Sequence, residues 1–285
     1  MPEGPEARVV ADQLQPLLVG KMLQDCSHLG PLQQIITVGK QLYFIFEDKR
    51  WLLNSSLGMT GHWLISLEGI KISNKHKFYT LRWGSQLTPL ATDESGEVTS
   101  QMLVLDTVVY YHDVRKFGNI TWLTYAEACK KMRGFKRDWL QHLVPQDYLI
   151  EIPTCVTDPP TMDIICNSDK PICEVLLDQK ISSGVGNYIR CEALYLADIH
   201  PFSIANKIPQ DKREDLYQAI CDVMLEAYKH NGLTLGDFIS PNHNLGVYQP
   251  VVYDLATTAD GYDVVKLPIE KRNVHVCLET QVLYE

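Results

Sequence analysis

The stretch Ile181-Ser-Ser-Gly-Val-Gly-Asn187 joins two segments with helical patterning, residues 171–180 before it and residues 188–195 after it. Its two glycines free the backbone for unusual dihedral angles and for close approach by another molecule. Asn187 is a favourable N-cap for the second segment, and a helix N-terminus presents unpaired N–H groups and positive potential that suit a phosphate. The stretch therefore predicts a hairpin of two helices, which serves either as a phosphate site or as structure alone.

Further towards the C-terminus, residues 211–230 have an apolar stripe at helical spacing, and Asn231-Gly232 provides a C-cap. The chain then returns to β-type patterning in residues 263–267 and 273–278, which are expected to pair as a hairpin. The sequence contains no internal repeat and no low-complexity tract. The C-terminal part is therefore expected to be helical and to end in a β-hairpin.

The N-terminal part is patterned differently. Residues 3–18 have a loose apolar face at helical spacing, and Gly20 is a natural stop for that helix. Short β-type segments follow, punctuated by turns at Ser95-Gly96 and Phe117-Gly118-Asn119. Many short strands at this spacing predict a β-sandwich or barrel-like domain that ends near residue 125. The expected strands are residues 34–38, 42–46, 51–53, 78–83, 102–105, 107–111 and 120–122.

These patterns predict an α+β fold, in which a helix and a β-sandwich precede a helical domain. A stretch rich in basic residues and prolines separates the two parts. Its run Cys129-Lys-Lys-Met-Arg-Gly-Phe-Lys-Arg137 is either a solvated linker or helix face, or a surface that contacts DNA. The expected domains are residues 1–125, a linker at 126–160, a helical domain at 161–250 and a hairpin at 251–285.

Length and composition limit the class of protein. With 285 residues the chain is long enough for two domains. It has no run of about 18 apolar residues and no secretory signal pattern, so we expect a soluble, intracellular protein that does not bind membranes. The formal net charge of −9 counts against nucleic acid as the default partner, although it concerns the average and not the local distribution of charge.

The first residues, Met1-Pro2-Glu3, give the clearest indication of chemistry. Removal of Met1 would leave a secondary amine at Pro2. An α-amino group has a pKa of about 7.7–8.0, so an appreciable fraction is neutral near pH 7, and such an amine condenses with an aldehyde carbon to a charged iminium. Glu3 is a candidate acid or base beside this amine. The stretch is either catalytic or an ordinary start to a helix.

The eight cysteines have no metal-binding spacing. None forms a C-x-x-C pair, and in a reducing compartment they are expected to be buried free thiols. The sequence therefore predicts no zinc site and no other cofactor.

Five motifs together resemble the formamidopyrimidine-DNA glycosylase and endonuclease VIII (Fpg/Nei) family of base-excision repair enzymes. They occur in the order of that family and span nearly the whole chain. They are Pro2-Glu-Gly-Pro-Glu6, Val38-Gly-Lys-Gln-Leu42, Leu57-Gly-Met-Thr-Gly61, Asp113-Val-Arg-Lys-Phe-Gly118 and Leu177-Asp-Gln-Lys-x3-Gly-Val-Gly-Asn187. The last matches the signature of the family's helix-two-turn-helix element, so the resemblance implies a DNA-binding domain of that kind.

The family's zinc finger is the exception. It closes with R-x-x-x-x-C-x-x-C-Q, whereas this chain has Arg272-Asn-Val-His-Val-Cys277-Leu-Glu-Thr280-Gln281, with threonine at the second cysteine position. The upstream C-x-x-C is absent from residues 251–271. The chain is therefore similar to the zincless-finger branch of endonuclease VIII-like enzymes, in which the hairpin folds on packing alone. The arginine of the finger is retained.

The resemblance also implies roles for individual residues. Pro2 would attack the sugar C1′, and Glu3 would act as general acid and base. Lys40 and Arg272 would hold the flanking phosphates, whereas without the resemblance Lys40 would be interpreted as an edge-strand surface lysine and Arg272 as a turn residue. Glu6 matches a family glutamate close to the site. The implied DNA contacts are Met59, Arg115 and Phe117, which fill the space left by a flipped nucleotide, and His76 and Asn187, which bind phosphate.

The predicted function is a bifunctional DNA glycosylase and abasic-site (AP) lyase. By resemblance to the zincless branch, it would act on oxidised pyrimidines and further-oxidised guanine in double-stranded DNA, as a monomer. Two other interpretations stay open: a protein that binds damaged or abasic DNA without cutting it, and a small-molecule enzyme that uses its N-terminal amine. Retention of Pro2, Glu3 and Lys40 counts against the first, and the Arg115-Lys-Phe-Gly118 loop counts against the second.

Overall fold

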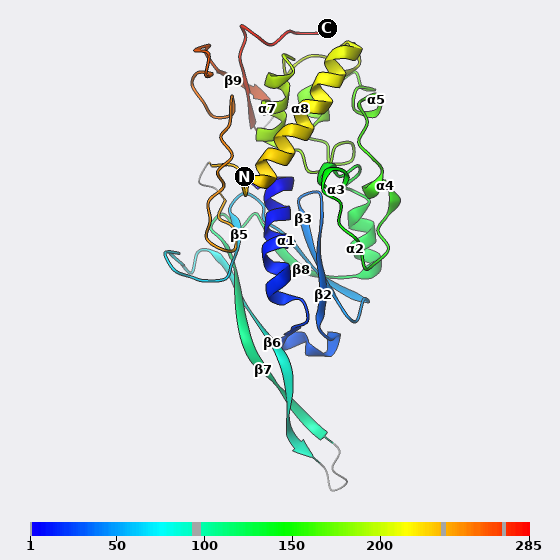
Figure 1. The fold of residues 1–285 in the computed structure, drawn as a ribbon, viewed down its shortest axis with the longest axis vertical. Coiled ribbons are helices and arrows are strands. Elements are labelled where there is room, and N and C mark those ends of the chain that lie inside the picture. The colour runs from blue at the N-terminus through cyan, green and yellow to red at the C-terminus, as the bar shows by residue number, and fades with distance from the viewer. Residues whose placement is uncertain (1, 93–97, 235–237, 270–271) are drawn as a thin grey trace.

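The computed structural model describes residues 2–92, 98–234, 238–269 and 272–285. A β-sandwich forms the N-terminal half, a helical body forms the C-terminal half, and helix α1 (Gly4–Leu18) contacts both (Figure 1). This is the α+β arrangement that the sequence predicts. Among the described helices, none is long and apolar enough to cross a membrane.

Two antiparallel four-stranded sheets make the sandwich, with the strand orders β2-β3-β4-β8 and β1-β6-β7-β5. Aromatic side chains fill the space between the sheets. Phe46 stacks on Trp83 with ring centroids 6.1 Å apart, and Phe44 meets Trp63 at 5.1 Å. The strands are β1 (Met22–Leu23), β2 (Leu32–Val38), β3 (Gln41–Phe46), β4 (Trp51–Ser56), β5 (Gly61–Leu64), β6 (Lys77–Thr92), β7 (Val98–Asp113) and β8 (Asn119–Thr124), and a 3-10 helix (Gln24–Leu29) joins β1 to β2.

Strands β6 and β7 are longer than the sequence predicts. Each has 16 residues, and together they form a ribbon that projects away from the body (Figure 1). The predicted separate strands at residues 102–105 and 107–111 are one strand, which corrects that expectation. Asp106, which interrupts the apolar pattern, lies on the ribbon surface, where its carboxylate accepts a hydrogen bond from Lys21 at 2.8 Å. The predicted turn at Ser95-Gly96 lies outside the described residues.

The segment predicted as a linker, residues 126–160, covers the outer face of the first sheet. Ala128 and Met132 pack against apolar side chains of β2, β3 and β4 in a cluster separate from the sandwich core. Trp139 instead belongs to the core of the C-terminal body. The segment thus contributes to both halves, and the predicted domain division stays a prediction. Its helices are α2 (Tyr125–Met132), α3 (Trp139–Leu143) and α4 (Thr154–Thr157).

The helical body is built around α7 and α8, which pack together over the C-terminal core. A two-stranded antiparallel sheet, β9 and β10, follows as the hairpin that the sequence predicts. Val274 and Val276 of β10 are fully buried, so the hairpin is anchored to the body by packing. The elements are α5 (Met162–Ile165), α7 (Asn187–Leu196), a 3-10 turn (Ala205–Lys207), α8 (Gln210–Lys229), β9 (Val265–Ile269) and β10 (Arg272–Val276).

The helix predicted at residues 171–180 is much shorter, because α6 covers only Ile172–Val175. The chain leaves the helix where the Gln179 side chain takes over backbone groups of the following turn. Its Nε2 donates to the carbonyl oxygens of Leu177 and Val185 at 3.0 and 2.9 Å. Such side-chain bonds offer the backbone an alternative to the helical pattern, and they fix the turn that leads into α7.

Candidate active site

The first turn of α1 brings two carboxyl groups together. Glu3 is the N-cap of the helix and is only 1% exposed, and its backbone N–H donates to Glu6 Oε2 at 2.8 Å. Glu3 Oε1 accepts from the backbone N–H of Tyr188 at 3.0 Å, whereas the buried Glu3 Oε2 has no hydrogen-bond partner among the described residues. Pro2, which precedes it, is also buried. One oxygen of Glu3 therefore remains unpaired beside a pocket that Glu3 lines.

Gly186 makes this placement of Glu3 possible. A Cβ atom at this position would lie 2.1 Å from Glu3 Cδ and 2.3 Å from Glu3 Oε1. The predicted N-cap of α7, Asn187, is wrong by one residue: Gly186 is the N-cap and Asn187 is the first helical residue. Because glycine has no side chain to satisfy the first N–H groups of the helix, the carboxyl group of Glu3 does so instead.

Glu6 holds α1 in place from the other side. Its Oε1 accepts from the hydroxyl of Tyr188 and from the backbone N–H of Leu233, each at 3.0 Å. Gly232 allows this approach, because a Cβ atom there would lie 2.7 Å from Glu6 Oε1, and its φ of +99° also favours glycine. Glu6 is therefore a structural anchor for the helix that carries Glu3.

Burial shifts the pKa values of Glu3 and Lys40 in opposite directions, and both shifts favour the neutral form. Burial raises the pKa of Glu3; the charge of Lys40 opposes this shift and the charge of Glu6 adds to it. Burial lowers the pKa of Lys40, where Glu3 opposes the shift and Arg272 adds to it. A carboxyl group with a raised pKa can donate a proton near neutral pH, and a lysine with a lowered pKa is more often in the neutral form that can accept one.

Lys40 lies in the tight turn between β2 and β3. It follows Gly39, whose φ of +59° favours glycine. Asp138 Oδ2 accepts from the Gly39 N–H at 2.6 Å, while Asp138 Oδ1 accepts from the Leu140 N–H at 3.0 Å as the N-cap of α3. Burial raises the pKa of Asp138 to about 6. The turn that carries Lys40 is thus held by a carboxyl group 99 residues beyond Gly39.

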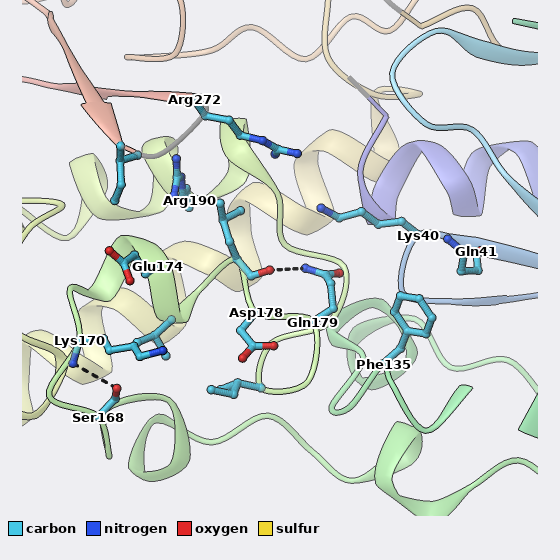
Figure 2. A pocket seen from close by; sticks show the side chains of 14 residues that line it. Lys40, Gln41, Phe135, Ser168, Lys170, Glu174, Asp178, Gln179, Arg190 and Arg272 are labelled. Atoms are coloured by element: carbon cyan, nitrogen blue, oxygen red, sulfur yellow. Dashed lines mark hydrogen bonds between the residues drawn. The ribbon is translucent and has the colours of Figure 1, made fainter. Parts of the chain in front are cut away.

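Two pockets meet at Arg272, the first residue of β10. The larger, of about 790 Å³, is lined by Lys40, Arg190 and Arg272, and Figure 2 shows Lys40 and Arg272 pointing toward the same space. The smaller, of about 580 Å³, is lined by Glu3, Asn187 and Arg272. Four residues that the sequence singles out therefore line adjoining cavities.

The loop at residues 113–118 is fixed by the fully buried carboxylate of Asp113. Thr60 Oγ1 donates to Asp113 Oδ1 and the Gly118 N–H donates to Asp113 Oδ2, both at 2.7 Å. Lys116 has a φ of +62°, in the left-handed region that is uncommon outside glycine. The loop is therefore held in one conformation by its own acidic residue.

The predicted gap-filling residues gather around this loop. Phe117 is 63% exposed at its tip, so it is not a core residue. Arg115 is also exposed, and its Nη1 lies 4.0 Å from the Sδ of Met59. Met59 is half-buried and lines the smaller pocket. An aromatic ring, a guanidinium and a thioether are thus presented next to the pocket that contains Glu3.

His76, the remaining predicted phosphate contact, lines neither pocket. It is half-buried just before β6, and its Nδ1 lies 2.8 Å from Nε2 of the buried His112. Burial lowers the pKa of His112, and His76 adds to this shift. One of the two rings must donate to the other, so His76 is fixed in orientation by its partner.

The end of the hairpin is held by one glutamine. Gln281 Oε1 accepts from the Cys277 N–H at 2.8 Å, and Gln281 Nε2 donates to the Ile199 carbonyl at 2.8 Å. All eight cysteines are free thiols, and that of Cys277 lies 3.6 Å from Glu279 Oε2. Within residues 2–92, 98–234, 238–269 and 272–285, no group of three or more His, Cys, Asp or Glu side chains could hold a metal ion.

The sequence analysis assigned no role to three residues that build the site: Asp138, Arg190, and Gln179, which lies within one of the quoted motifs. Arg190 donates to the side-chain oxygen of Asn187. The sequence could have indicated this contact, because residues three apart on a helix are neighbours. The contact between Asp138 and Gly39 gives none, because it joins segments that are distant in the sequence.

Comparison with known proteins adds to this geometry. A family model described as the formamidopyrimidine-DNA glycosylase H2TH domain matches residues 156–238. The formamidopyrimidine-DNA glycosylase of Lactobacillus gasseri is 28% identical, with 100% of both chains covered, and that of Thermus thermophilus is 28% identical over 97% of both. The crystal structure of the MutM (Fpg) protein of Thermus thermophilus has a TM-score of 0.74 at 23% identity and covers 98% of both chains. A complex between the Lactococcus lactis Fpg and an abasic site containing DNA has a TM-score of 0.72 at 20% identity, covering 98% of this chain and 99% of that one.

The fold and the matched domain place the protein in the class of helix-two-turn-helix DNA glycosylases. The matched region contains the Gln179 turn and the start of α7, which holds the Glu3 carboxyl group. Within that class, the matched domain, the relatives and the fold all resemble the Fpg/Nei family.

Proposed function

We propose that this protein removes oxidised bases from DNA and then cuts the strand at the abasic site it has made. The observation that carries the proposal is the buried carboxyl group of Glu3, which keeps one oxygen unpaired and lines a pocket with Asn187 and Arg272. Glu3 directly follows Pro2, whose nitrogen is the nucleophile in this proposal. The relatives named formamidopyrimidine-DNA glycosylase support the base-removal step.

Base removal begins once loss of Met1 has freed the nitrogen of Pro2. This nitrogen attacks C1′ of the damaged nucleoside, and the bond from C1′ to the base breaks, so that the base leaves with the bonding electrons and takes up a proton. Glu3, whose pKa is raised by burial, gives a proton to the ring oxygen O4′, and the bond from C1′ to O4′ breaks. The nitrogen loses its remaining proton, and a C1′=N iminium joins the enzyme to the opened sugar.

Strand cleavage follows from the electron-withdrawing iminium. A proton leaves C2′ and the bond from C3′ to O3′ breaks, which releases one flanking phosphate (β-elimination). A second elimination breaks the bond from C5′ to O5′ (δ-elimination). Lys40 and Arg272 line one pocket, and both would pair with the phosphates. A phosphate beside Lys40 would favour the charged form of its amine.

The proposed partner is double-stranded DNA with an oxidised base or an abasic site, bound by a monomer. To reach the glycosidic bond, the nucleotide is flipped out and the gap in the stack is filled. The exposed Phe117, the guanidinium of Arg115 and the thioether of Met59 support this role. Preference for oxidised pyrimidines and further-oxidised guanine is proposed from the resemblance to the zincless-finger branch.

Borohydride trapping tests the proposal. The protein is incubated with duplexes that carry an abasic site or thymine glycol, and reduction of the iminium should leave it covalently attached to DNA. Pro2→Gly should weaken or abolish trapping. Pro16→Ala is the matched control, because Pro16 is exposed within the same helix and should have no effect. Specific binding of abasic DNA without trapping or cleavage on any lesion would identify a non-catalytic binding protein and overturn the proposal.

A further inference from the structure

Arg190 is a buried cation whose hydrogen bonds within the described part of the chain go to neutral oxygens. It is 1% exposed on α7, one turn after Asn187. Its Nε and Nη2 donate to Asn187 Oδ1 at 3.0 and 2.6 Å, and its Nη1 donates to the Cys173 carbonyl at 2.7 Å. None of these partners is a carboxylate, so the part of the chain that the structure describes does not neutralise this charge by direct contact. Because burying a charge is costly, these three hydrogen bonds must hold the guanidinium firmly in place.

The larger pocket has the charge that an anion needs. Four cationic side chains line it, Lys40, Lys170, Arg190 and Arg272, against two carboxylates, Glu174 and Asp178 (Figure 2). One oxygen of the Asp178 carboxylate already has a hydrogen-bond donor, because Oδ1 accepts from the Lys180 N–H at 2.9 Å. The excess of positive charge stands out in a protein whose formal net charge is −9. A DNA phosphate is the anion that the proposed function brings to this place.

The contact with Arg190 also fixes the amide of Asn187. An amide oxygen that accepts two guanidinium N–H groups cannot turn away without leaving buried donors unpaired. Its nitrogen must therefore face the opposite way, where it donates to the Asn273 carbonyl at 3.1 Å. Asn273 follows Arg272 at the start of β10, so the guanidinium of Arg190 indirectly links α7 to the hairpin.

We propose that Arg190 is a positioning residue for phosphate binding. It holds the side chain of Asn187 with the amide nitrogen toward the hairpin and the smaller pocket, so that Asn187 presents N–H donors, and not its oxygen, to the DNA backbone. This inference rests on the proposed function and deepens it. A lysine at this position would keep the charge but could not place two parallel N–H groups on one oxygen. The fork of the guanidinium, and not its charge alone, is therefore the property to test.

The test is a double-mutant cycle on DNA affinity. The dissociation constant is measured for a duplex with a tetrahydrofuran abasic-site analogue, which cannot be processed, using the full chain. Variants are Arg190→Met, Arg190→Lys, Asn187→Ala and the double variant Arg190→Met/Asn187→Ala. Arg213→Met is the matched control, because among the described residues this guanidinium also donates to neutral carbonyls, those of Ile208 and Asn206, and it lines neither pocket. Melting temperatures of all variants are measured without DNA.

Arg190→Met should weaken binding about 10- to 100-fold, the effect expected for hydrogen bonds to a charged group. In the Asn187→Ala background the same change should cost less than about threefold, because Arg190 would have no amide to orient. Arg190→Lys should recover the melting temperature but not the affinity, and it replaces Arg190→Met in the cycle if that variant does not fold.

Three results would overturn the inference: equal losses in both backgrounds, wild-type affinity for Arg190→Lys, or a fall in melting temperature without a change in affinity. Failure of the proposed function is distinguishable from these, because it is seen in the wild type itself: either no borohydride trapping and no strand cleavage, or binding of the analogue no tighter than binding of undamaged duplex.

Discussion

Replacing Gly186 by alanine tests whether the position of the Glu3 carboxyl group controls activity. The added Cβ would lie 2.1 Å from Glu3 Cδ, 2.3 Å from Oε1 and 2.5 Å from Oε2, whereas ordinary contact begins at 3.4 Å. The carboxyl group must therefore retreat by at least 3.4 − 2.1, or 1.3 Å, if the backbone stays in place. It can then no longer accept the Tyr188 N–H at its present distance of 3.0 Å.

The size of the effect follows from this displacement. A shift of about 1 Å in a catalytic group can cost roughly 10²-fold in rate. We therefore expect the rate of base excision by Gly186→Ala to fall by about 100-fold or more. Loss of the buried bond to Tyr188 should also cost about 1.5–3 kcal/mol of stability, the range for hydrogen bonds to charged groups. The protein should therefore remain folded but melt several degrees lower.

The assay is single-turnover excision from a thymine glycol duplex, with the dissociation constant for the tetrahydrofuran duplex measured alongside. Gly134→Ala is the control, because its added Cβ would meet only the Lys131 carbonyl oxygen, at 3.2 Å, and its activity should stay within about twofold of wild type. Excision by Gly186→Ala within about threefold of wild type would refute the reasoning that the Glu3 carboxyl group acts from this position.

Three further predictions concern other parts of the molecule. Asp138 has a pKa of about 6 in the folded protein against 3.8 in the unfolded chain, so its ionisation should cost the wild type up to about 3 kcal/mol of unfolding free energy as pH rises between these values. The unfolding free energy of Asp138→Asn, measured by urea titration, should lack this decline. If it fell with pH as steeply as that of the wild type, the raised pKa of Asp138 would be contradicted. Phe117→Ala should leave the melting temperature unchanged, because the ring is 63% exposed, yet weaken binding of the tetrahydrofuran duplex about 10-fold through lost stacking; unchanged affinity would remove Phe117 from the interface. Dialysis against a strong zinc chelator should alter neither activity nor melting temperature, and stoichiometric zinc in metal analysis would contradict this. Gln281→Ala should destabilise the protein by about 1–3 kcal/mol by leaving the Cys277 N–H and Ile199 carbonyl unpaired; an unchanged free energy of unfolding would contradict that.

The fold was predictable where local patterning agrees with the final packing. The apolar face of α1, the β-type runs of the sandwich and the stripe of α8 all follow from side-chain periodicity. The prediction of a helix at residues 171–180 was wrong because one side chain, Gln179, binds the backbone of the next turn, and periodicity does not report such bonds. The length of the β6–β7 ribbon was underestimated because Asp106 interrupts the apolar pattern but not the pairing of the strands.

The candidate site was predictable only in its motif residues. The resemblance supplied Glu3, Lys40, Asn187 and Arg272, which line the two adjoining pockets. It did not supply the groups that hold them, since those contacts join distant parts of the chain. Asp138, which holds the Lys40 turn, and Arg190, which orients Asn187, have no function that their neighbours in the sequence reveal. Their roles depend on three-dimensional proximity.

The placement of Glu3 has a consequence for how the protein is made. Its carboxyl group is held by an N–H group 185 residues later, and that of Glu6 by one 227 residues later. A ribosome releases Glu3 early but Leu233 late, so an incomplete chain has its first helix without the partners that fix the two acids. The arrangement of acids that the proposed function needs is therefore complete only when synthesis is nearly finished.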